Sequence, residues 1–435
     1  MRDTSPLGLP LNETNESFAT SVNARERRLL TLAGLFVVTI HTGLILARQI
    51  SAIEYWHVVI WIVCAVFGHL TLQRRLPRRD PFLFPIVMLL TGWGLTLIDR
   101  LAPPFASRQT LWLIISVGAL LALVSLPGDL RWLRRYRYLW LTGGLGLLLL
   151  TILIGTNPSG GGPRLWLGVP DVYFQPSEVL KVLLVAYFAS YLADHQALLG
   201  EGGRIGAFRL PSLRFLGPVL IVWGLTVLIL VWQQNLGTAT LFFVIFLAML
   251  YLATNDVKQI IAGIVVLGIA TVVGYQRIAV VRLRVTIWAD PWPYVRSTSF
   301  QIVQSLLAFA AGGVFGQGVG QGSPTYIPVV HSDFVFAAIA EEWGLIGTLA
   351  VTLCFALLVM RGMRIAAQMQ GRSFRAYLAA GVSITLAAQS LLITGGVLKL
   401  IPMTGVTLPF MSYGGSSLLA YFLMAGLLIV LSNGV

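Results

Sequence analysis

The sequence predicts an all-α membrane protein that crosses the bilayer about twelve times. Of its 435 residues, 57% are hydrophobic and only 11% are charged, and the mean hydropathy is +0.82. A soluble domain carries about a quarter charged residues. The apolar residues gather in runs of roughly 20, the length that a helix needs to span a bilayer. Clusters of basic residues separate these runs.

Twelve apolar segments are candidate transmembrane helices. They are residues 29–46, 53–72, 81–98, 110–126, 136–155, 176–193, 214–232, 237–254, 258–274, 333–360, 374–399 and 410–432.

The residues before the first span, 1–24, are polar and lack the apolar core of a signal peptide, so we expect an uncleaved cytoplasmic tail. With twelve spans, the basic clusters between the runs all fall on one side of the membrane. The bias of basic residues toward the cytoplasm then places that side, and both chain termini, in the cytoplasm. The clusters are Arg25, Arg27 and Arg28; Arg74, Arg75, Arg78 and Arg79; Arg131, Arg134, Arg135 and Arg137; Arg204, Arg209 and Arg214; and Arg361, Arg364, Arg372 and Arg375. Because they do not form one patch, the net charge of +13 does not indicate a nucleic-acid partner.

Three connections on the outer side are candidates for a site, namely residues 156–175, 275–332 and 400–409. The middle one is the longest in the chain. It contains an apolar stretch, 299–313, that is too short to span and is expected to form a re-entrant or interfacial helix.

The two cysteines, Cys64 and Cys354, lie in apolar runs, where packing is the expected role rather than a disulfide or metal site. The five histidines show no metal-ligand spacing.

Ionisable residues inside predicted spans are functional candidates, because an unpaired charge in lipid is costly. Glu178 and Lys181 are three residues apart at the start of the sixth span, so they share a helix face and can pair. The spacing alone leaves two interpretations open. One is a self-neutralising pair that fixes helix packing, and the other is a charged lining of an outward-facing cavity.

Asp333 begins the tenth span. It could cap the helix together with Ser332, or it could act as an ionised general base or metal ligand, with its pKa lowered by the helix dipole. Glu341, about 12 Å further along the axis, is expected to bond to another helix and to support Asp333. Glu342 points to another face, and no role is assigned to it.

Two glycine-rich stretches, 158–168 and 312–322, lack the pattern of a P-loop and are weak candidates for phosphate binding. Arg164 lies in the first of them, at the outer rim. It could grip a pyrophosphate with two hydrogen bonds or anchor lipid head groups.

Several long motifs occur in the order found in one known family. They are "RLWLGVPDVYFQPSEVLK" (164–181), "QNLGTA" (234–239), "QSLLAFAAGGVFGQGVGQGSPTYIPVVHSDFVFAAIAEEWGLIG" (304–347) and "GVTLPFMSYGGSSLLAYFLMAGLLIVLS" (405–432). They resemble the SEDS family (FtsW/RodA/SpoVE), from about Asp80 to Asn433.

The resemblance implies a ten-helix core over residues 80–435, preceded by two additional helices in residues 25–79 that have no assigned function. It also implies a peptidoglycan glycosyltransferase that polymerises lipid II at the outer face of the bacterial cytoplasmic membrane. The implied partner is a class B penicillin-binding protein, which cross-links the glycan. Whether the role is in elongation or division is left open.

The resemblance also implies a set of site residues. The family's essential aspartate, in H-T-D-F-I-F-A, matches Asp333, and its paired Glu and Lys match Glu178 and Lys181. Arg164 matches an extracellular arginine of the family. Within the matching motifs, His331 and Ser332 are assigned to substrate binding, and Gln304, Ser412 and Tyr413, with Glu341, to supporting roles.

The chain departs from the family pattern at four places. Asn235 replaces an aspartate, Ser332 replaces a threonine, Val329 and Val330 stand where Pro-Glu is common, and Leu165 separates Arg164 from Trp166.

The expected mechanism has Asp333 take the proton of a sugar hydroxyl, or hold a metal, while Arg164 and Lys181 stabilise the departing pyrophosphate and Glu178 orients Lys181. No cofactor is firmly implied. A divalent cation such as Mg²⁺ or Mn²⁺ could share the work, although no ligand set is recognisable. Two alternatives stand beside this function: a transporter that flips lipid II, and a non-catalytic scaffold of a division or elongation complex.

Overall fold

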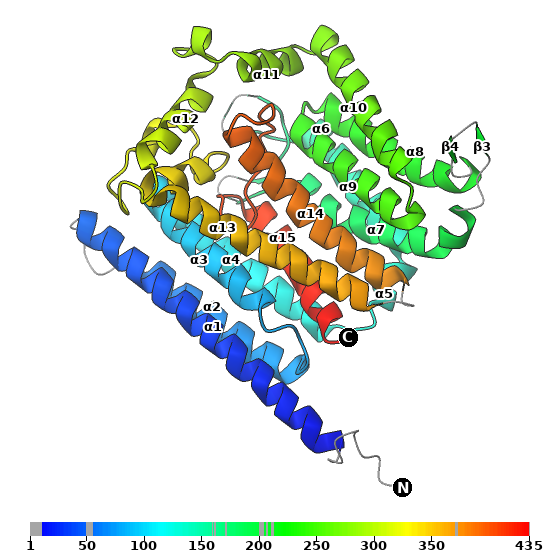
Figure 1. Ribbon diagram of the computed structural model, residues 1–435, viewed down its shortest axis with the longest axis horizontal. Helices are drawn as coiled ribbons and strands as arrows, with labels where there is room; N and C mark the ends of the chain where they lie inside the picture. The colour runs from blue at the N-terminus through cyan, green and yellow to red at the C-terminus, as the bar shows by residue number, and fades with distance from the viewer. Residues whose placement is uncertain are drawn as a thin grey trace.

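The structure is a computed structural model, and it describes residues 11–48, 55–158, 160, 162–169, 172–199, 204–205, 208–209, 213–369 and 373–434. It is a bundle of long helices with two very short hairpins (Figure 1). The helices are α1 (Leu11–Arg48), α2 (Trp56–Arg75), α3 (Leu83–Leu101), α4 (Pro103–Ser125), α5 (Arg131–Arg135), α6 (Arg137–Ile154), α7 (Pro176–Leu199), α8 (Leu213–Trp232), α9 (Leu236–Thr254), α10 (Val257–Arg277), α11 (Ala279–Ala289), α12 (Phe300–Gly312), α13 (Val335–Gln368), α14 (Ser373–Val397) and α15 (Gly415–Ser432), with 3₁₀ turns η2 (Trp292–Tyr294) and η3 (Pro324–Tyr326).

Eleven helices within the described ranges are long and apolar enough to cross a membrane, so the chain is a multi-pass membrane protein. A helix occupies each of the twelve expected spans. However, the seventh, α8, contributes only the shorter apolar stretch Leu216–Trp232 to this set. The all-helical class is confirmed, whereas the count of twelve spans is not.

The centre of the bundle is formed by α3, α7 and α15. In each of these helices, 83% of the residues in the most apolar 18-residue stretch are buried inside the protein. The corresponding share for α10, at the periphery, is 11%. A helix that is apolar all round and buried belongs to the interior of a bundle, and one that is apolar but uncovered faces lipid. The central helices therefore carry the side chains that can form an internal site.

Several of the basic clusters lie at one end of the bundle. The turn between α2 and α3 is tied to the end of α15, because the Arg78 backbone N–H donates to Asn433 Oδ1 at 2.8 Å and the Asp80 N–H donates to Ser432 Oγ at 3.0 Å. Arg361 of α13 lies 3.4 Å from Asp80, and Arg375 of α14 donates to the Gly128 carbonyl at 2.9 Å. The connections that the sequence placed on one side thus meet in space.

The two N-terminal helices pack against α3 and α4 (Figure 1). Trp61 of α2 donates from Nε1 to the Met88 carbonyl at 3.0 Å. One turn nearer the start of α2, His57 Nδ1 lies 2.7 Å from Thr110 Oγ1 on α4. Helix α1 already begins at Leu11, so residues 11–24 of the expected polar tail are helical. Both contacts of α2 lie near its start, and they attach this end of the hairpin to α3 and α4.

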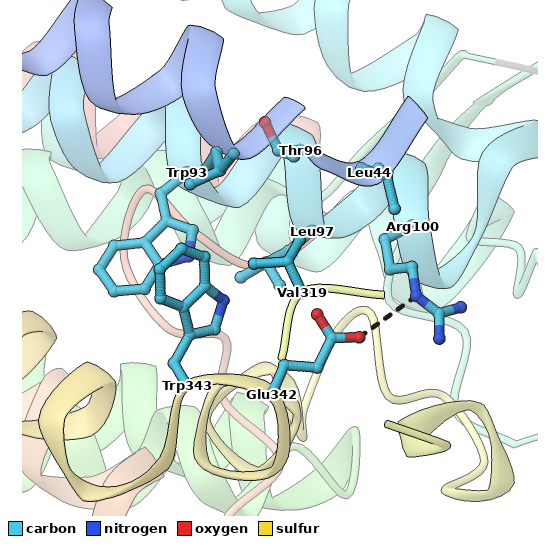
Figure 2. Close-up of a pocket in the computed structure, with 9 residues that line it drawn as sticks. Leu44, Trp93, Thr96, Leu97, Arg100, Val319, Glu342 and Trp343 are labelled. Carbon is cyan, nitrogen blue, oxygen red and sulfur yellow. Dashed lines mark ion pairs between the residues drawn. The ribbon is translucent and has the colours of Figure 1, made fainter. Parts of the chain in front are cut away.

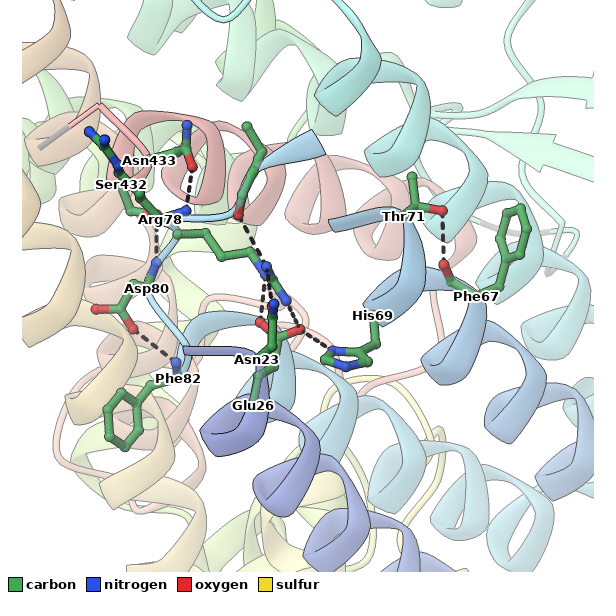
Figure 3. A network of polar contacts seen from close by, with 12 residues as sticks. Asn23, Glu26, Phe67, His69, Thr71, Arg78, Asp80, Phe82, Ser432 and Asn433 are labelled. Atoms are coloured by element: carbon green, nitrogen blue, oxygen red, sulfur yellow. Dashed lines mark hydrogen bonds and ion pairs between the residues drawn. The ribbon is translucent and has the colours of Figure 1, made fainter. Parts of the chain in front are cut away.

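A buried ion pair reinforces this attachment (Figure 3). Arg79, in the turn after α2, donates from Nε and Nη2 to the two carboxylate oxygens of Glu26 on α1, at 2.8 and 2.7 Å. His69 Nδ1 lies 2.6 Å from the same carboxylate, and Asn23 accepts a further bond from Arg79. Because a buried charge is costly unless it is paired, this cluster fixes α1 against the turn.

The outer connections contain more structure than the sequence indicated. In the outer connection 156–175, β1 (Leu167–Val169) pairs antiparallel with β2 (Val172–Phe174). A second antiparallel pair, β3 (Arg204–Ile205) with β4 (Phe208–Arg209), lies between α7 and α8, in a connection that the sequence predicts to be cytoplasmic. The helix expected at 299–313 is α12, which packs against α13. In Figure 1, α11 and α12 lie across one end of the bundle, so this long connection lies next to the start of α13.

Candidate functional site

Asp333 lies in a turn just before α13, and its side chain is half-buried. The N-terminal cap of α13 is Phe334, and no side chain caps the helix. The turn is instead closed by the Val329 carbonyl, which accepts the N–H groups of Ser332 and Asp333 at 3.1 and 3.4 Å. Val329 has φ 55°, an unfavourable value for a β-branched residue. The expected capping role of Ser332 and Asp333 is therefore wrong, and strain is stored beside the carboxylate.

Asp333 lines a cavity of about 200 Å³. Its walls come from α11, from the start of α12 and the segment before it, from the turn before α13, and from the end of α14 with the connection to α15. The lining residues are Arg284, Ile287, Trp288, Thr298, Gln301, Ile302, Asp333, Phe334, Gly396, Lys399, Ile401, Met403 and Gly405. The cavity thus joins two of the three outer connections that the sequence singled out.

The electrostatics of the cavity differ from those expected. Burial raises the pKa of the Asp333 carboxyl above its ordinary value, and the hydrogen bond from Ser332 and the charge of Arg284 offset part of the rise. The Ser332 hydroxyl donates to Asp333 Oδ1 at 2.8 Å. The expectation that the helix dipole would lower this pKa is wrong, because removal from water outweighs it. A raised pKa brings a carboxylate closer to the range of an efficient general base.

The structure brings His331, Ser332, Ser412 and Tyr413 together beside Asp333. The Ser412 hydroxyl donates to the Ser332 carbonyl at 2.5 Å, and the Tyr413 N–H donates to the His331 carbonyl at 2.8 Å. The His331 ring lies 5.0 Å, between centroids, from the ring of Phe105. Burial lowers the pKa of His331, so its ring is neutral in this setting.

Glu178 and Lys181 form the second polar cluster, deep in the bundle. Lys181 Nζ lies 2.7 Å from Glu178 Oε2 and donates to Gln389 Oε1 on α14 at 2.7 Å and to the Tyr421 hydroxyl on α15 at 3.2 Å. Only 1% of the Lys181 side chain is exposed. The predicted ion pair between Glu178 and Lys181 is confirmed. However, the ammonium group of Lys181 donates to three groups within the protein, and Lys181 does not line the Asp333 cavity.

The connection between α14 and α15 links the two clusters. Gln389, which receives the bond from Lys181, donates from Nε2 to the Thr407 carbonyl at 2.7 Å. The Thr407 hydroxyl lies 2.8 Å from Ser417 Oγ, and five residues after Thr407 in the chain Ser412 bonds to Ser332. The intramembrane pair therefore helps to fix the backbone that forms one wall of the cavity.

Helix α13 is interrupted at Gly344, which has φ 63° and ψ −158°. The glycine-rich segment 312–322 fills the break: the N–H groups of Gln317 and Gly318 donate to the carbonyls of Glu341 and Glu342 at 2.8 and 3.0 Å, and Leu345 donates to Gly313 at 2.9 Å. The continuous span expected at 333–360 is wrong in this detail. The backbone groups of this segment pair with those that the break in α13 would otherwise leave without a hydrogen-bond partner.

The two glutamates next to the break hold the chain at the end of this segment, one directly and one through Arg100. Glu341 Oε1 accepts the Ser323 N–H at 2.7 Å, so its partner is a loop and not, as expected, a neighbouring helix. Glu342 lies 3.2 Å from Arg100 Nε, and Arg100 donates to the Gly322 carbonyl at 2.9 Å (Figure 2). Trp93 and Trp343 lie side by side next to this pair, with ring centroids 5.2 Å apart. Both carboxylates hold the chain that leads to Asp333.

Two expected site residues, Arg164 and Gln304, and the substituted position Asn235 lie apart from the cavity. Arg164 is exposed and has no hydrogen bond or ion pair with the described residues. Gln304 is half-buried on α12 and also makes no side-chain hydrogen bond there. Asn235 precedes α9 without capping it, and its buried Nδ2 has no hydrogen-bond partner.

The donor set does not fit a divalent cation. Within the part of the chain that the structure describes, no group of three or more His, Cys, Asp or Glu side chains could hold a metal ion. Among the residues that line the cavity, Asp333 is the one carboxylate, and the cation Arg284 faces it. Oxygen-rich sets with several carboxylates suit such ions, and a neighbouring guanidinium does not.

Five residues of these clusters were not predicted from the sequence, namely Arg284, Lys399, Gln389, Tyr421 and Arg100. A polar Gln389 inside an apolar run was a signal that could have identified it. Arg284 and Lys399 carried no such signal, because they lie in outer connections where basic residues are ordinary.

Comparisons with known proteins agree on one family. The family model FtsW/RodA/SpoVE, described as "Cell cycle protein", matches residues 82–434. The chain is 38% identical over 383 residues to "Peptidoglycan glycosyltransferase RodA" of Mycobacterium tuberculosis, covering 85% of this chain and 81% of that protein. It is 34% identical over 374 residues to "Probable peptidoglycan glycosyltransferase FtsW" of Geobacter sulfurreducens, covering 83% of this chain and 96% of that protein.

Solved structures share the fold. One chain from "Structural coordination of polymerization and crosslinking by a peptidoglycan synthase complex" is 25% identical with a TM-score of 0.67, covering 82% of this chain and 98% of its own length. The Thermus thermophilus rod shape determining protein RodA is 24% identical with a TM-score of 0.58, covering 81% of this chain and 96% of its own length.

Proposed function

Because the chain belongs to the FtsW/RodA/SpoVE family of cell cycle proteins, we propose that it is a peptidoglycan glycosyltransferase that polymerises lipid II at the outer face of the cytoplasmic membrane. The curated relatives carry the name of this activity. The observation that carries the proposal is Asp333, half-buried in a cavity of about 200 Å³ and opposed by a cation. That arrangement suits proton removal from a hydroxyl next to an anionic leaving group.

In the proposed reaction, a sugar hydroxyl attacks the anomeric carbon of a lipid-linked disaccharide. The new glycosidic bond forms as the bond to the pyrophosphate breaks, and the electron pair of that bond leaves with the pyrophosphate. Asp333 takes the hydroxyl proton. Its raised pKa favours this transfer, and Ser332 holds the carboxylate by donating to Oδ1.

Orientation and partner belong to the same proposal. The basic connections that meet near Asp80 would be cytoplasmic, with both termini, and the Asp333 cavity would face the exterior. A class B penicillin-binding protein would cross-link the product. The similarity to a chain of a peptidoglycan synthase complex, in which polymerisation and crosslinking are coordinated, supports such a partner.

The test is a polymerisation assay with purified protein, a class B partner and labelled lipid II. Asp333→Asn is expected to abolish glycan chains, because an amide cannot take the proton. Asp290→Asn is the matched control: Asp290 lies in the same connection, its Oδ1 accepts the Trp292 N–H at 3.2 Å, and it does not line the cavity. An undiminished rate for Asp333→Asn would show that the base is wrongly assigned.

Two further measurements separate the alternatives. Flipping and polymerisation can be followed independently in liposomes, and a transporter would flip lipid II without forming chains. A scaffold would support growth when Asp333→Asn replaces the wild-type chain in cells, whereas a polymerase would not.

A further inference from the structure

Two cations face the Asp333 cavity, and neither belongs to the expected site. Arg284 comes from α11 and Lys399 from the connection after α14. Within the part of the chain that the structure describes, Asp333 is the one acidic residue among those lining the cavity, so its charged groups carry a net positive charge when all are ionised. An excess of positive charge in a half-enclosed space favours an anionic ligand.

Both cations are held in place and keep donors to spare. Arg284 Nη1 donates to the Thr404 carbonyl at 3.1 Å. Lys399 Nζ lies 3.4 Å from the Ala289 carbonyl, and the Lys399 carbonyl accepts the Trp288 indole N–H at 3.1 Å. A guanidinium has five N–H donors and an ammonium three, so each side chain retains donors after these contacts. Both side chains are therefore positioned by contacts within the protein before any ligand binds.

Gly405 faces both Arg284 and Asp333. A Cβ atom at that glycine would lie 3.6 Å from Arg284 Nη2 and 3.8 Å from Asp333 Oδ2, which are ordinary van der Waals distances. The space that a methyl group would occupy is thus left open between an acceptor and a donor. An oxygen atom of a substrate fits such a space.

We propose that Arg284 and Lys399 bind the pyrophosphate of the lipid-linked donor and stabilise it as it departs. This proposal rests on the proposed function and replaces the expected assignment of Arg164 and Lys181 to that group. Lys181 is buried among Glu178, Gln389 and Tyr421, and Arg164 lies outside the cavity. The anomeric carbon would then lie between Asp333 and the two cations, with the departing charge on their side.

The first experiment measures kcat and KM for lipid II in the full-length protein with its class B partner. Arg284→Gln is expected to lower kcat on the order of 100-fold, because one donor to a developing oxyanion is lost. Lys399→Met is expected to lower it about tenfold. Arg284→Lys should recover part of the loss. Arg282→Gln is the matched control, because Arg282 lies on the same helix but is exposed and bonds to the carbonyls of Tyr275 and Gln276.

The second experiment measures equilibrium binding of a labelled short-chain polyprenyl pyrophosphate and of the corresponding monophosphate. In Arg284→Gln and Lys399→Met, the affinity for the pyrophosphate is expected to fall about tenfold more than that for the monophosphate. A purely structural role would reduce both equally. Equal losses, or variants that bind and polymerise as the wild type does, would overturn the proposal.

The two readouts distinguish this proposal from the function on which it rests. If the wild type polymerises and the variants keep their preference for the pyrophosphate, the function stands and the subsite is wrong. If the variants lose that preference while wild-type protein forms no glycan, the subsite stands and the polymerase function is wrong.

Discussion

Arg79 and Glu26 form a two-pronged ion pair between the turn after α2 and the helix α1, with N–O distances of 2.8 and 2.7 Å. Both side chains are fully buried. The family match begins at residue 82, so this pair joins the additional N-terminal hairpin to the segment that leads into the family core. The hairpin is therefore an integral part of the folded protein rather than an appended anchor.

Removing one partner of this pair is expected to be costly. Arg79→Ala leaves the Glu26 carboxylate buried with only His69 beside it, and should lower the free energy of unfolding by about 3–5 kcal/mol. Thermal unfolding in detergent measures the loss, with the exposed Arg75→Ala as control. The double variant Glu26→Gln/Arg79→Met should regain much of it, and a stability like that of Arg79→Ala alone would contradict the pairing.

Activity is expected to fall on acidification as Asp333 takes up a proton. Because burial raises its pKa above 3.8, the acidic limb of the kcat/KM profile should lie at a higher pH than an ordinary aspartate gives. Arg284 lowers this pKa, so Arg284→Gln should move the limb to still higher pH. His331 is a titratable group nearby, and burial lowers its pKa, which favours its neutral form. An acidic limb that Arg284→Gln leaves in place would contradict this account.

The raised pKa of Asp333 also makes the folding stability depend on pH. The dependence is opposite in direction to that of an aspartate whose pKa is lowered by folding. A carboxyl whose pKa is raised on folding contributes stability that is fully present below its unfolded-state pKa. That stability is lost as the pH rises through the folded-state pKa. Asp333→Asn should therefore be at least as stable as the wild type at neutral pH, which thermal unfolding can check alongside the assay. A clear loss of stability would indicate that Asp333 is structural.

Lys181 is expected to be required because of its partners rather than through contact with substrate. Lys181→Met leaves the Glu178 carboxylate uncompensated inside the bundle, at a cost of about 3–5 kcal/mol. Exchanging the two charges restores a neutral pair and should recover part of the stability and activity. The recovery should be incomplete, because Gln389 and Tyr421 are arranged to accept from an ammonium at position 181, where the exchange places a carboxylate. The exposed Lys258→Met is the control. No recovery in the double exchange would argue against direct contact.

The break in α13 is expected to be essential. A Cβ at Gly344 would lie 2.5 Å from the Gly316 nitrogen and the Val314 oxygen, so Gly344→Ala should displace the 312–322 segment and reduce both stability and polymerisation. Gly313→Ala isolates the steric effect, because Gly313 also has a positive φ (52°) but nothing lies within 4 Å of its Cβ position. Its cost should be the backbone strain alone, of order 1–3 kcal/mol. Equal effects of the two substitutions would show that the close packing at Gly344 is unimportant.

The apolar runs by themselves determined the helical class and the approximate place of every long helix, because crossing lipid requires about 20 apolar residues whose backbone groups are satisfied within the segment. The i, i+3 spacing of Glu178 and Lys181 determined their pairing, since a helix places such residues on one face. The motif around Asp333 identified the carboxylate of the candidate site.

Tertiary structure decided what surrounds each of these groups. Arg284 and Asp333 line the same cavity only because α11 lies over the start of α13. Lys181 bonds to Gln389 and Tyr421 only because α7, α14 and α15 pack together. The pKa of Asp333 rises rather than falls for the same reason: removal from water depends on distant segments, and local helix position is the weaker influence. Periodicity along a chain fixes which residues share a helix face, but it carries no information on which distant segment will cover that face.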